Sequence, residues 1–256
     1  MRWMRGAVVA VAAVLTTALA GCSGATDAGT EGGDSITVFA AASLKSTFTE
    51  LGQRFEEQHP GTRVVFNFAG SSDLVAQLDQ GAPGDVFASA DTANMTKAVQ
   101  AGLTASEPVN FATNTLTIVV PPGNPANIAS FADLARPDVK VVVCAPQVPC
   151  GTATQKIEDA TGIRLTPVSE ESSVTDVLGK VVTGQADAGL VYVTDATAAG
   201  DKVAEIPFPE ATKVVNTYPI VVLKDSGNPE AASEFTGYVT GPEGRAVLSE
   251  AGFGAP

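Results

Sequence analysis

Short β-rich runs alternate with helical patterns of about 10–15 residues along most of this chain. The first run, 36–41, passes through a turn into a helical stripe. The stripe consists of Leu44, Phe48, Leu51 and Phe55. This spacing predicts one apolar helix face that continues to about Glu57. Such alternation predicts an α/β fold with mainly parallel, doubly wound strands, in which ligands lie outside the carboxyl ends of the strands.

Four strand-to-helix turns carry small or hydroxyl-bearing residues at the predicted helix N-termini. They lie at Ser43, Ser71, Cys150–Gly151 and Ser173–Val174. Ser43 follows three alanines and is the expected N-cap of the first helix, beside N–H groups that have no helical partner. One such serine commonly does no more than cap its helix, but the repetition indicates an anion site. Tyr192 ends a further predicted strand and adds another hydroxyl at a strand-to-helix corner.

The groups offered at these turns are hydroxyls and backbone N–H groups, which suit a fully ionised oxyanion. Acidic residues outnumber basic ones by 28 to 15, for a formal net charge of −13, which argues against nucleic acid and anionic membrane surfaces as partners. No Gly-x-Ser-x-Gly elbow or Walker loop occurs, and the one histidine, His59, follows the first helix. The sequence therefore predicts a binding protein that has no catalytic activity and no cofactor.

The N-terminal segment is typical of an export signal. A short basic start precedes an uncharged, mostly apolar run over 6–19, which is too short for a comfortable membrane span. The run ends in Leu19-Ala-Gly-Cys22, which resembles the bacterial lipoprotein box and predicts a signal peptide over 1–21 and a lipidated Cys22. An ordinary signal peptide is the alternative. Residues 22–34 lack large apolar side chains and are the expected tether to the outer face of the cell membrane.

Apart from Cys22, the chain has two cysteines, Cys144 and Cys150, with five residues between them. In an oxidising compartment these two are expected to form a disulfide. Two buried thiols, or half of a metal site, are the alternatives. A zinc or iron–sulfur centre would lack ligands, because the chain has a single histidine and no second cysteine pair.

Four motifs share the order and spacing of one transport family. They are Ala-Ala-Ser-Leu at 41–44, Ala-Gly-Ser-Ser at 69–72, Gly-Ala-Pro-Gly-Asp-Val-Phe-Ala-Ser-Ala-Asp at 81–91 and Ala-Gly-Leu-Val-Tyr-Val-Thr-Asp-Ala at 188–196. With these motifs, the sequence from Ile36 to Phe253 resembles the periplasmic molybdate-binding proteins of ABC transporters. The resemblance implies a type II periplasmic binding fold, in which two doubly wound α/β domains surround a cleft for tetrahedral molybdate or tungstate.

The resemblance also implies the ligand-binding residues. The implied set comprises the hydroxyls of Ser43 and Ser71, the backbone N–H groups of Cys150 and Val174, and the hydroxyl of Tyr192. Ser72 is a close competitor of Ser71 for the second serine position. The pairing of Cys144 with Cys150 departs from the family's pattern and affects the shape of the loop that leads to the Cys150 N–H group.

Chain order predicts one domain over 35–113 and 218–256 and a second over 114–217, connected by two extended segments. The resemblance implies a high-affinity extracytoplasmic receptor that hands molybdate or tungstate to an ABC permease. We expect a monomer that touches the membrane only through its lipid anchor. Sulfate or phosphate is the alternative ligand, and a sensory or enzymatic domain on the same scaffold is the alternative class of protein.

Overall fold

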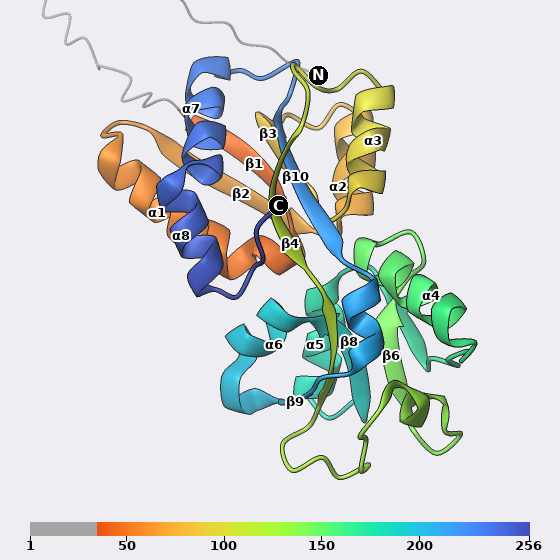
Figure 1. Ribbon diagram of the computed structural model, residues 1–256. Coiled ribbons are helices and arrows are strands. Elements are labelled where there is room, and N and C mark those ends of the chain that lie inside the picture. The colour runs from red at the N-terminus through yellow and green to blue at the C-terminus, as the bar shows by residue number, and fades with distance from the viewer. Residues whose placement is uncertain (1–34) are drawn as a thin grey trace, which may run out of the picture. The chain divides into compact units, whose positions relative to one another are not determined.

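The computed structural model describes residues 35–256. The predicted signal peptide, the lipidated Cys22 and the predicted tether lie outside the described residues. The described chain forms two five-stranded sheets with helices packed beside them (Figure 1). Within residues 35–256, no helix is both long enough and apolar enough to cross a membrane.

The first sheet has the strand order β2-β1-β3-β10-β4. The bounds are β1 Ser35–Ala41, β2 Arg63–Ala69, β3 Val86–Ala88, β4 Val109–Asn114 and β10 Asn216–Val222. Strand β1 pairs in parallel with β2 and β3, whereas β10 runs antiparallel to β3 and β4. The sheet is therefore mixed: β1, β2, β3 and β4 run in the same direction, as expected of mainly parallel strands, and β10, which returns from the second sheet, runs against them.

The second sheet has the strand order β7-β6-β8-β5-β9. The bounds are β5 Leu116–Val120, β6 Val141–Cys144, β7 Ser169–Glu171, β8 Ala188–Tyr192 and β9 Ala204–Ile206. Strand β6 is parallel to β7 and β8, whereas β5 is antiparallel to β8 and β9. Strand β5 continues directly from β4 across Thr115 and is not preceded by a helix that would return the chain. It therefore runs antiparallel to its neighbours β8 and β9.

Eight α-helices and four 3-10 helices accompany the sheets within the described residues. The α-helices are α1 Lys45–Gln58, α2 Ser71–Asp79, α3 Thr92–Gln100, α4 Pro149–Thr161, α5 Val174–Val182, α6 Val193–Ala199, α7 Pro229–Thr240 and α8 Pro242–Glu250. The 3-10 helices are η1 Ala42–Leu44, η2 Phe131–Ala135, η3 Gly200–Lys202 and η4 Pro209–Lys213. The predicted alternation of strands and helices is confirmed.

An aromatic cluster packs α1 against α7. The ring of Phe235 lies edge-on to Phe55 and Phe48, with centroid distances of 5.3 and 6.3 Å. All three side chains are fully buried, and burial of each contributes about 1.5–3 kcal/mol. The apolar stripe in the sequence predicts α1 correctly because its residues form this packed face.

Two segments connect the sheets. Strand β4 runs through Thr115 directly into β5, and β9 leads through η4 back to β10. At these crossings Asn114 and Asn216 face each other in the ladder between β4 and β10, which lie side by side in Figure 1. The described residues 35–256 fall within one compact unit, so the two domain boundaries stay a prediction.

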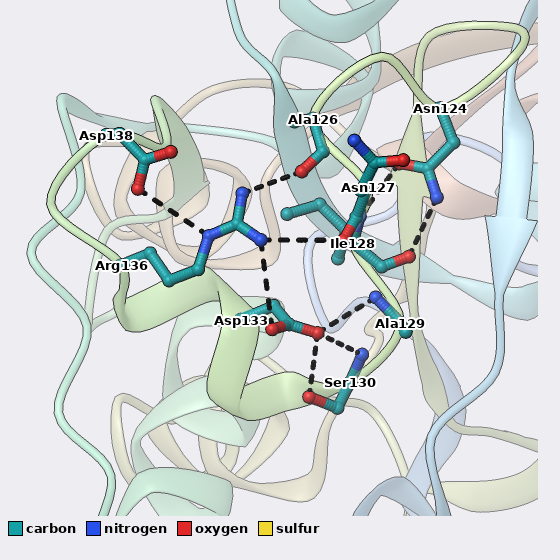
Figure 2. Close-up of polar contacts among 9 residues, drawn as sticks. All are labelled: Asn124, Ala126, Asn127, Ile128, Ala129, Ser130, Asp133, Arg136 and Asp138. Atoms are coloured by element: carbon teal, nitrogen blue, oxygen red, sulfur yellow. Dashed lines mark hydrogen bonds and ion pairs between the residues drawn. The ribbon is translucent and has the colours of Figure 1, made fainter.

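The loop between β5 and β6 is held by its own polar contacts (Figure 2). The Arg136 side chain donates to the carbonyl oxygen of Ala126 at 2.6 Å. The Asp133 carboxylate accepts from the backbone N–H groups of Ala129 and Ser130, each at 2.9 Å, and these bonds lower the pKa of Asp133. Because β5 is antiparallel to β8, this loop lies at the end of the sheet opposite to the carboxyl ends of β6 and β8.

Candidate anion-binding site

One small cavity brings together all five residues of the implied ligand set. Its walls consist of Ala41, Ala42, Ser43, Gly70, Ser71, Ala90, Val148, Pro149, Cys150, Val174 and Tyr192. None of these lining residues has a charged side chain. The cavity leaves about 10 Å³ for the centre of a water-sized sphere, which is about the room of one water molecule. Ser72 lies outside it and lines a different cavity, beside Lys97 and Gln147.

The cavity lies where the carboxyl ends of strands from both sheets meet. Ser43 follows β1 and Ser71 follows β2, and these two strands are parallel. Cys150 follows β6, Val174 follows β7 and Tyr192 ends β8, and these three strands are parallel to one another. The strand-to-helix turns of each sheet therefore lie together at one edge. In α/β folds, ligands bind at this edge, outside the carboxyl ends of the strands.

Ser43 is not the N-cap that the sequence predicts. It lies within the 3-10 helix η1, and α1 begins at Lys45 without a side-chain cap. The Ser43 hydroxyl oxygen lies 3.1 Å from the hydroxyl oxygen of Tyr218 on β10. The apolar stripe locates the helix correctly, but it does not reveal that the chain tightens into a 3-10 turn before it. Ser43 nevertheless lies in the cavity wall.

Ser71 is the first residue of α2, after the N-cap residue Gly70. Its Oγ atom accepts a hydrogen bond from the backbone N–H of Ala90 at 3.0 Å. Because that oxygen already accepts a hydrogen bond, the hydroxyl hydrogen stays available for a ligand oxygen. The Oγ atom of the adjacent Ser72 is buried and has no hydrogen-bond partner within residues 35–256.

Two helix N-termini beside the second sheet carry the implied backbone donors. Cys150 is the second residue of α4, after Pro149, and Val174 is the first residue of α5. N–H groups in the first turn have no partner within their own helix. They also lie at the positive end of the helix dipole, which favours an anion. Ser173 caps α5 by accepting from the N–H of Asp176 at 3.3 Å, so this cap does not engage the N–H of Val174, which lines the cavity.

Tyr192 brings a buried phenol to the cavity. Its side chain is 1% exposed, and its hydroxyl oxygen accepts a hydrogen bond from Nδ2 of Asn216 at 3.0 Å. Burial raises the pKa of the Tyr192 phenol well above its usual value, and burial also raises the pKa of the neighbouring Tyr218. Both phenols are therefore protonated at physiological pH and can act as neutral donors.

Acidic side chains stay outside the cavity wall. Asp195 lies in the first turn of α6, where its carboxylate accepts from the backbone N–H of Tyr192 at 3.1 Å. Burial raises the pKa of Asp195 to about 7. In the described part of the chain, no group of three or more His, Cys, Asp or Glu residues is placed to hold a metal ion. The wall thus offers hydroxyl and N–H donors and no carboxylate.

Gly70 is a wall residue that the sequence marks only as part of the motif Ala-Gly-Ser-Ser at 69–72. A Cβ atom at this position would lie 2.1 Å from the carbonyl oxygen of Ser172 and 3.4 Å from Cγ1 of Val148. Val174 and Cys150, the implied backbone donors, lie two residues after Ser172 and Val148, respectively. The missing side chain therefore lets the turn after β2 approach the turns that carry both donors.

The sequence also does not predict the contacts that Asn216, Tyr218 and Ala90 make with the hydroxyls of the implied ligand set. These residues contact the hydroxyls of Tyr192, Ser43 and Ser71, respectively. Ala90 also lines the cavity, whereas Asn216 and Tyr218 do not. Asn216 and Tyr218 belong to a β-strand, and they lie 24 and 175 residues from the hydroxyls that they contact. Of these three residues, only Ala90 lies in one of the four motifs, the one at 81–91.

Cys144 and Cys150 are joined by a disulfide, as predicted. Cys144 ends β6, and Cys150 lies in the first turn of α4. The short loop between them is also closed by hydrogen bonds from the N–H of Val148 to the Ala145 carbonyl, at 2.9 Å, and from the Thr152 hydroxyl to the Pro146 carbonyl, also at 2.9 Å. The bridge therefore restricts the loop that carries the Cys150 N–H into the cavity wall.

Replacing both cysteines, as Cys144→Ser with Cys150→Ser, is expected to weaken oxyanion binding and leave the fold intact. A loop this short contributes only on the order of 2 kcal/mol to stability through chain entropy, so the main loss is preorganisation of the Cys150 N–H. Calorimetric titration with and without a reductant measures the effect. The double variant should not respond to the reductant, and equal affinity in both forms of the wild-type protein would contradict the prediction.

The chain is similar to solute-binding proteins of bacteria, and several of these relatives are named as molybdate-binding proteins. A family model described as bacterial extracellular solute-binding protein matches residues 36–254. The molybdate-binding protein ModA of Mycobacterium tuberculosis is 55% identical over 261 residues, which cover 100% of both chains. The molybdate-binding protein ModA of Escherichia coli is 30% identical, over 85% of this chain and 88% of that protein.

Solved structures share the fold. The periplasmic molybdate-binding protein of Azotobacter vinelandii gives a TM-score of 0.75 at 24% identity, over 86% of this chain and 99% of that one. The sulfate-binding protein SubI of Mycobacterium tuberculosis gives a TM-score of 0.74 at 21% identity, over 86% of each chain. At these identities the likeness concerns the fold, and it confirms the predicted α/β class of the type II periplasmic binding proteins.

Proposed function

The chain belongs to the bacterial extracellular solute-binding proteins, and we propose that it is a high-affinity receptor that delivers molybdate or tungstate to an ABC permease. One observation carries this proposal: three residues with hydroxyl groups and two residues at helix N-termini line one cavity whose wall has no charged side chain. The full-length mycobacterial relative at 55% identity, which is named a molybdate-binding protein, supports the same ligand.

The donor set suits a tetrahedral dianion. Each donor is neutral and comes from a strand end or a helix N-terminus, so hydrogen bonds and helix dipoles balance the anion's charge without ion pairs. Hydrogen phosphate carries a proton that needs an acceptor, and the cavity wall has no carboxylate to supply one. Molybdate, tungstate and sulfate are fully ionised at neutral pH, and the radius of the cavity is what separates them.

The family places the chain outside the cytoplasm. We propose that the signal peptide over 1–21 is removed, that Cys22 carries the lipid and that 22–34 tethers a monomeric, non-catalytic receptor without a cofactor to the outer face of the cell membrane. Fractionation of cells that express Cys22→Ser tests the anchor. The variant should leave the membrane fraction, and a variant that remains there would remove Cys22 from the proposal.

Calorimetric titration of the purified protein with four oxyanions tests the ligand assignment. Molybdate and tungstate are nearly equal in size, so they should bind with similar affinity and compete. Sulfate should bind at least about tenfold more weakly, a difference of about 1.4 kcal/mol, and phosphate more weakly still. Sulfate binding within tenfold of molybdate would transfer the assignment to sulfate, and phosphate as the tightest ligand would overturn the argument from missing acceptors.

A further inference from the structure

Asn216 is a buried side chain that contacts the site from behind without lining it. It begins β10, where the chain returns from the second sheet, and is 7% exposed. Its Nδ2 atom lies 2.9 Å from the carbonyl oxygen of Ala90 and 3.0 Å from the hydroxyl oxygen of Tyr192. The Asn216 side chain thus links the end of β3 in the first sheet to the end of β8 in the second.

The partners of Asn216 determine which way its hydrogen bonds run. A carbonyl oxygen only accepts, so the amide atom that faces Ala90 must be the nitrogen. The same nitrogen faces Tyr192, and each of its two hydrogens then has one acceptor. The Tyr192 oxygen therefore accepts from Asn216 and must donate its own hydrogen elsewhere.

Two acceptors can receive the Tyr192 hydrogen. One is the hydroxyl of Tyr218, which hydrogen-bonds with the Tyr192 side chain and whose ring packs edge-on against the Tyr192 ring. The other is an anion in the cavity that Tyr192 lines. An ionised oxygen forms roughly twice as strong a hydrogen bond as a neutral one, so the hydrogen turns to the anion when one is present.

We propose that Asn216 is a positioning residue that makes the Tyr192 hydroxyl a donor to the bound oxyanion. This inference rests on the proposed function, since it concerns the same cavity. The backbone of Ala90 then helps to orient two hydroxyls, those of Ser71 and Tyr192. The Ala90 N–H donates to Ser71 at 3.0 Å, and the Ala90 carbonyl holds Asn216, which in turn orients Tyr192. Both hydroxyls accept from the protein behind them and keep their own hydrogens for the ligand.

A double-mutant cycle with molybdate tests whether Asn216 acts through the Tyr192 hydroxyl. Asn216→Ala should lower the affinity about tenfold, or about 1.4 kcal/mol, in the wild-type background. In the Tyr192→Phe background, which has no hydroxyl to orient, the same change should cost no more than about twofold. Equal losses in both backgrounds would overturn the proposal, because a general structural effect of Asn216 would persist without the hydroxyl.

Asn114→Ala is the matched control. Asn114 is the ladder partner of Asn216, is 6% exposed and donates to the Thr194 hydroxyl at 2.8 Å. Its effect on affinity should be the same in the wild-type and Tyr192→Phe backgrounds. A coupling to Tyr192 as large as that of Asn216 would contradict a specific role for Asn216.

Asn216→Asp keeps the size of the side chain and provides a second variant if Asn216→Ala unfolds, which thermal unfolding would show. A carboxylate accepts the Tyr192 hydrogen and withdraws it from the ligand, so affinity should fall at least as far as in Asn216→Ala. Wild-type affinity in Asn216→Asp would overturn the proposal. If the wild-type protein itself does not bind molybdate, the proposed function fails instead, and this outcome is separate from the result of the cycle.

Discussion

Gly70→Ala is expected to weaken molybdate binding about 100-fold, or about 2.7 kcal/mol, and to leave the unliganded fold stable. The added Cβ would lie 2.1 Å from the Ser172 carbonyl oxygen, so the two turns must separate by about 1 Å to reach ordinary contact. Ser172 lies two residues before Val174, and separation moves the Val174 N–H away from the hydroxyls of the first sheet. Calorimetry measures the affinity, and thermal unfolding without ligand measures the stability.

Gly179→Ala is the matched control for this prediction. Gly179 lies in α5, and apart from its chain neighbours and the nearby backbone of its own helix, no described atom lies within 4 Å of the place where its Cβ would be. Alanine there should favour the helix by roughly 0.5–1 kcal/mol and leave the affinity unchanged. Wild-type affinity in Gly70→Ala would mean that the ligand-bound protein does not need the close approach between the turns of the two sheets.

The sequence predicts the elements of this fold well because strand and helix patterns are local. The stripe that ends at Phe55 becomes the buried face of α1, and the turns at Ser71 and Val174 are helix N-termini in the structure. Strand direction is not local. Strands β5 and β10 enter their sheets from crossing segments, and nothing in their apolar runs distinguishes an antiparallel strand from a parallel one. The strands are mainly parallel, as expected, but each sheet is mixed, because β5 or β10 runs against the other four strands.

The candidate site likewise contains residues that the sequence predicts and residues that it does not. Hydroxyls and N–H groups at strand ends leave a visible pattern, and the structure brings all five implied residues to one cavity. The residues that contact these groups leave no such pattern, because they lie in other elements and are of ordinary type. Ser43 is the clearest case, because its hydroxyl contacts Tyr218, 175 residues away, and the N-cap predicted from its neighbours does not form. Asn216 is as far as 126 residues from Ala90.

Ser71→Ala is expected to lower the affinity for molybdate about 10- to 150-fold and to destabilise the unliganded protein. The variant loses one hydrogen bond to a charged ligand, about 1.5–3 kcal/mol. It also removes the acceptor of the Ala90 N–H in a buried position, which costs about 1–3 kcal/mol of stability. Calorimetry and thermal unfolding measure the two effects separately. Unchanged affinity with reduced stability would limit Ser71 to a structural role.

Ser72→Ala decides between the two adjacent serines, since both lie in the first turn of α2 and both are buried. The Ser72 Oγ atom has no hydrogen-bond partner within the described residues and does not line the cavity. Removal of an unpaired buried hydroxyl relieves a desolvation cost and breaks no bond. The variant should therefore match the wild-type affinity and be at least as stable. If Ser72→Ala loses affinity and Ser71→Ala does not, the second ligand serine is Ser72, and the bond between Ala90 and Ser71 serves only the fold.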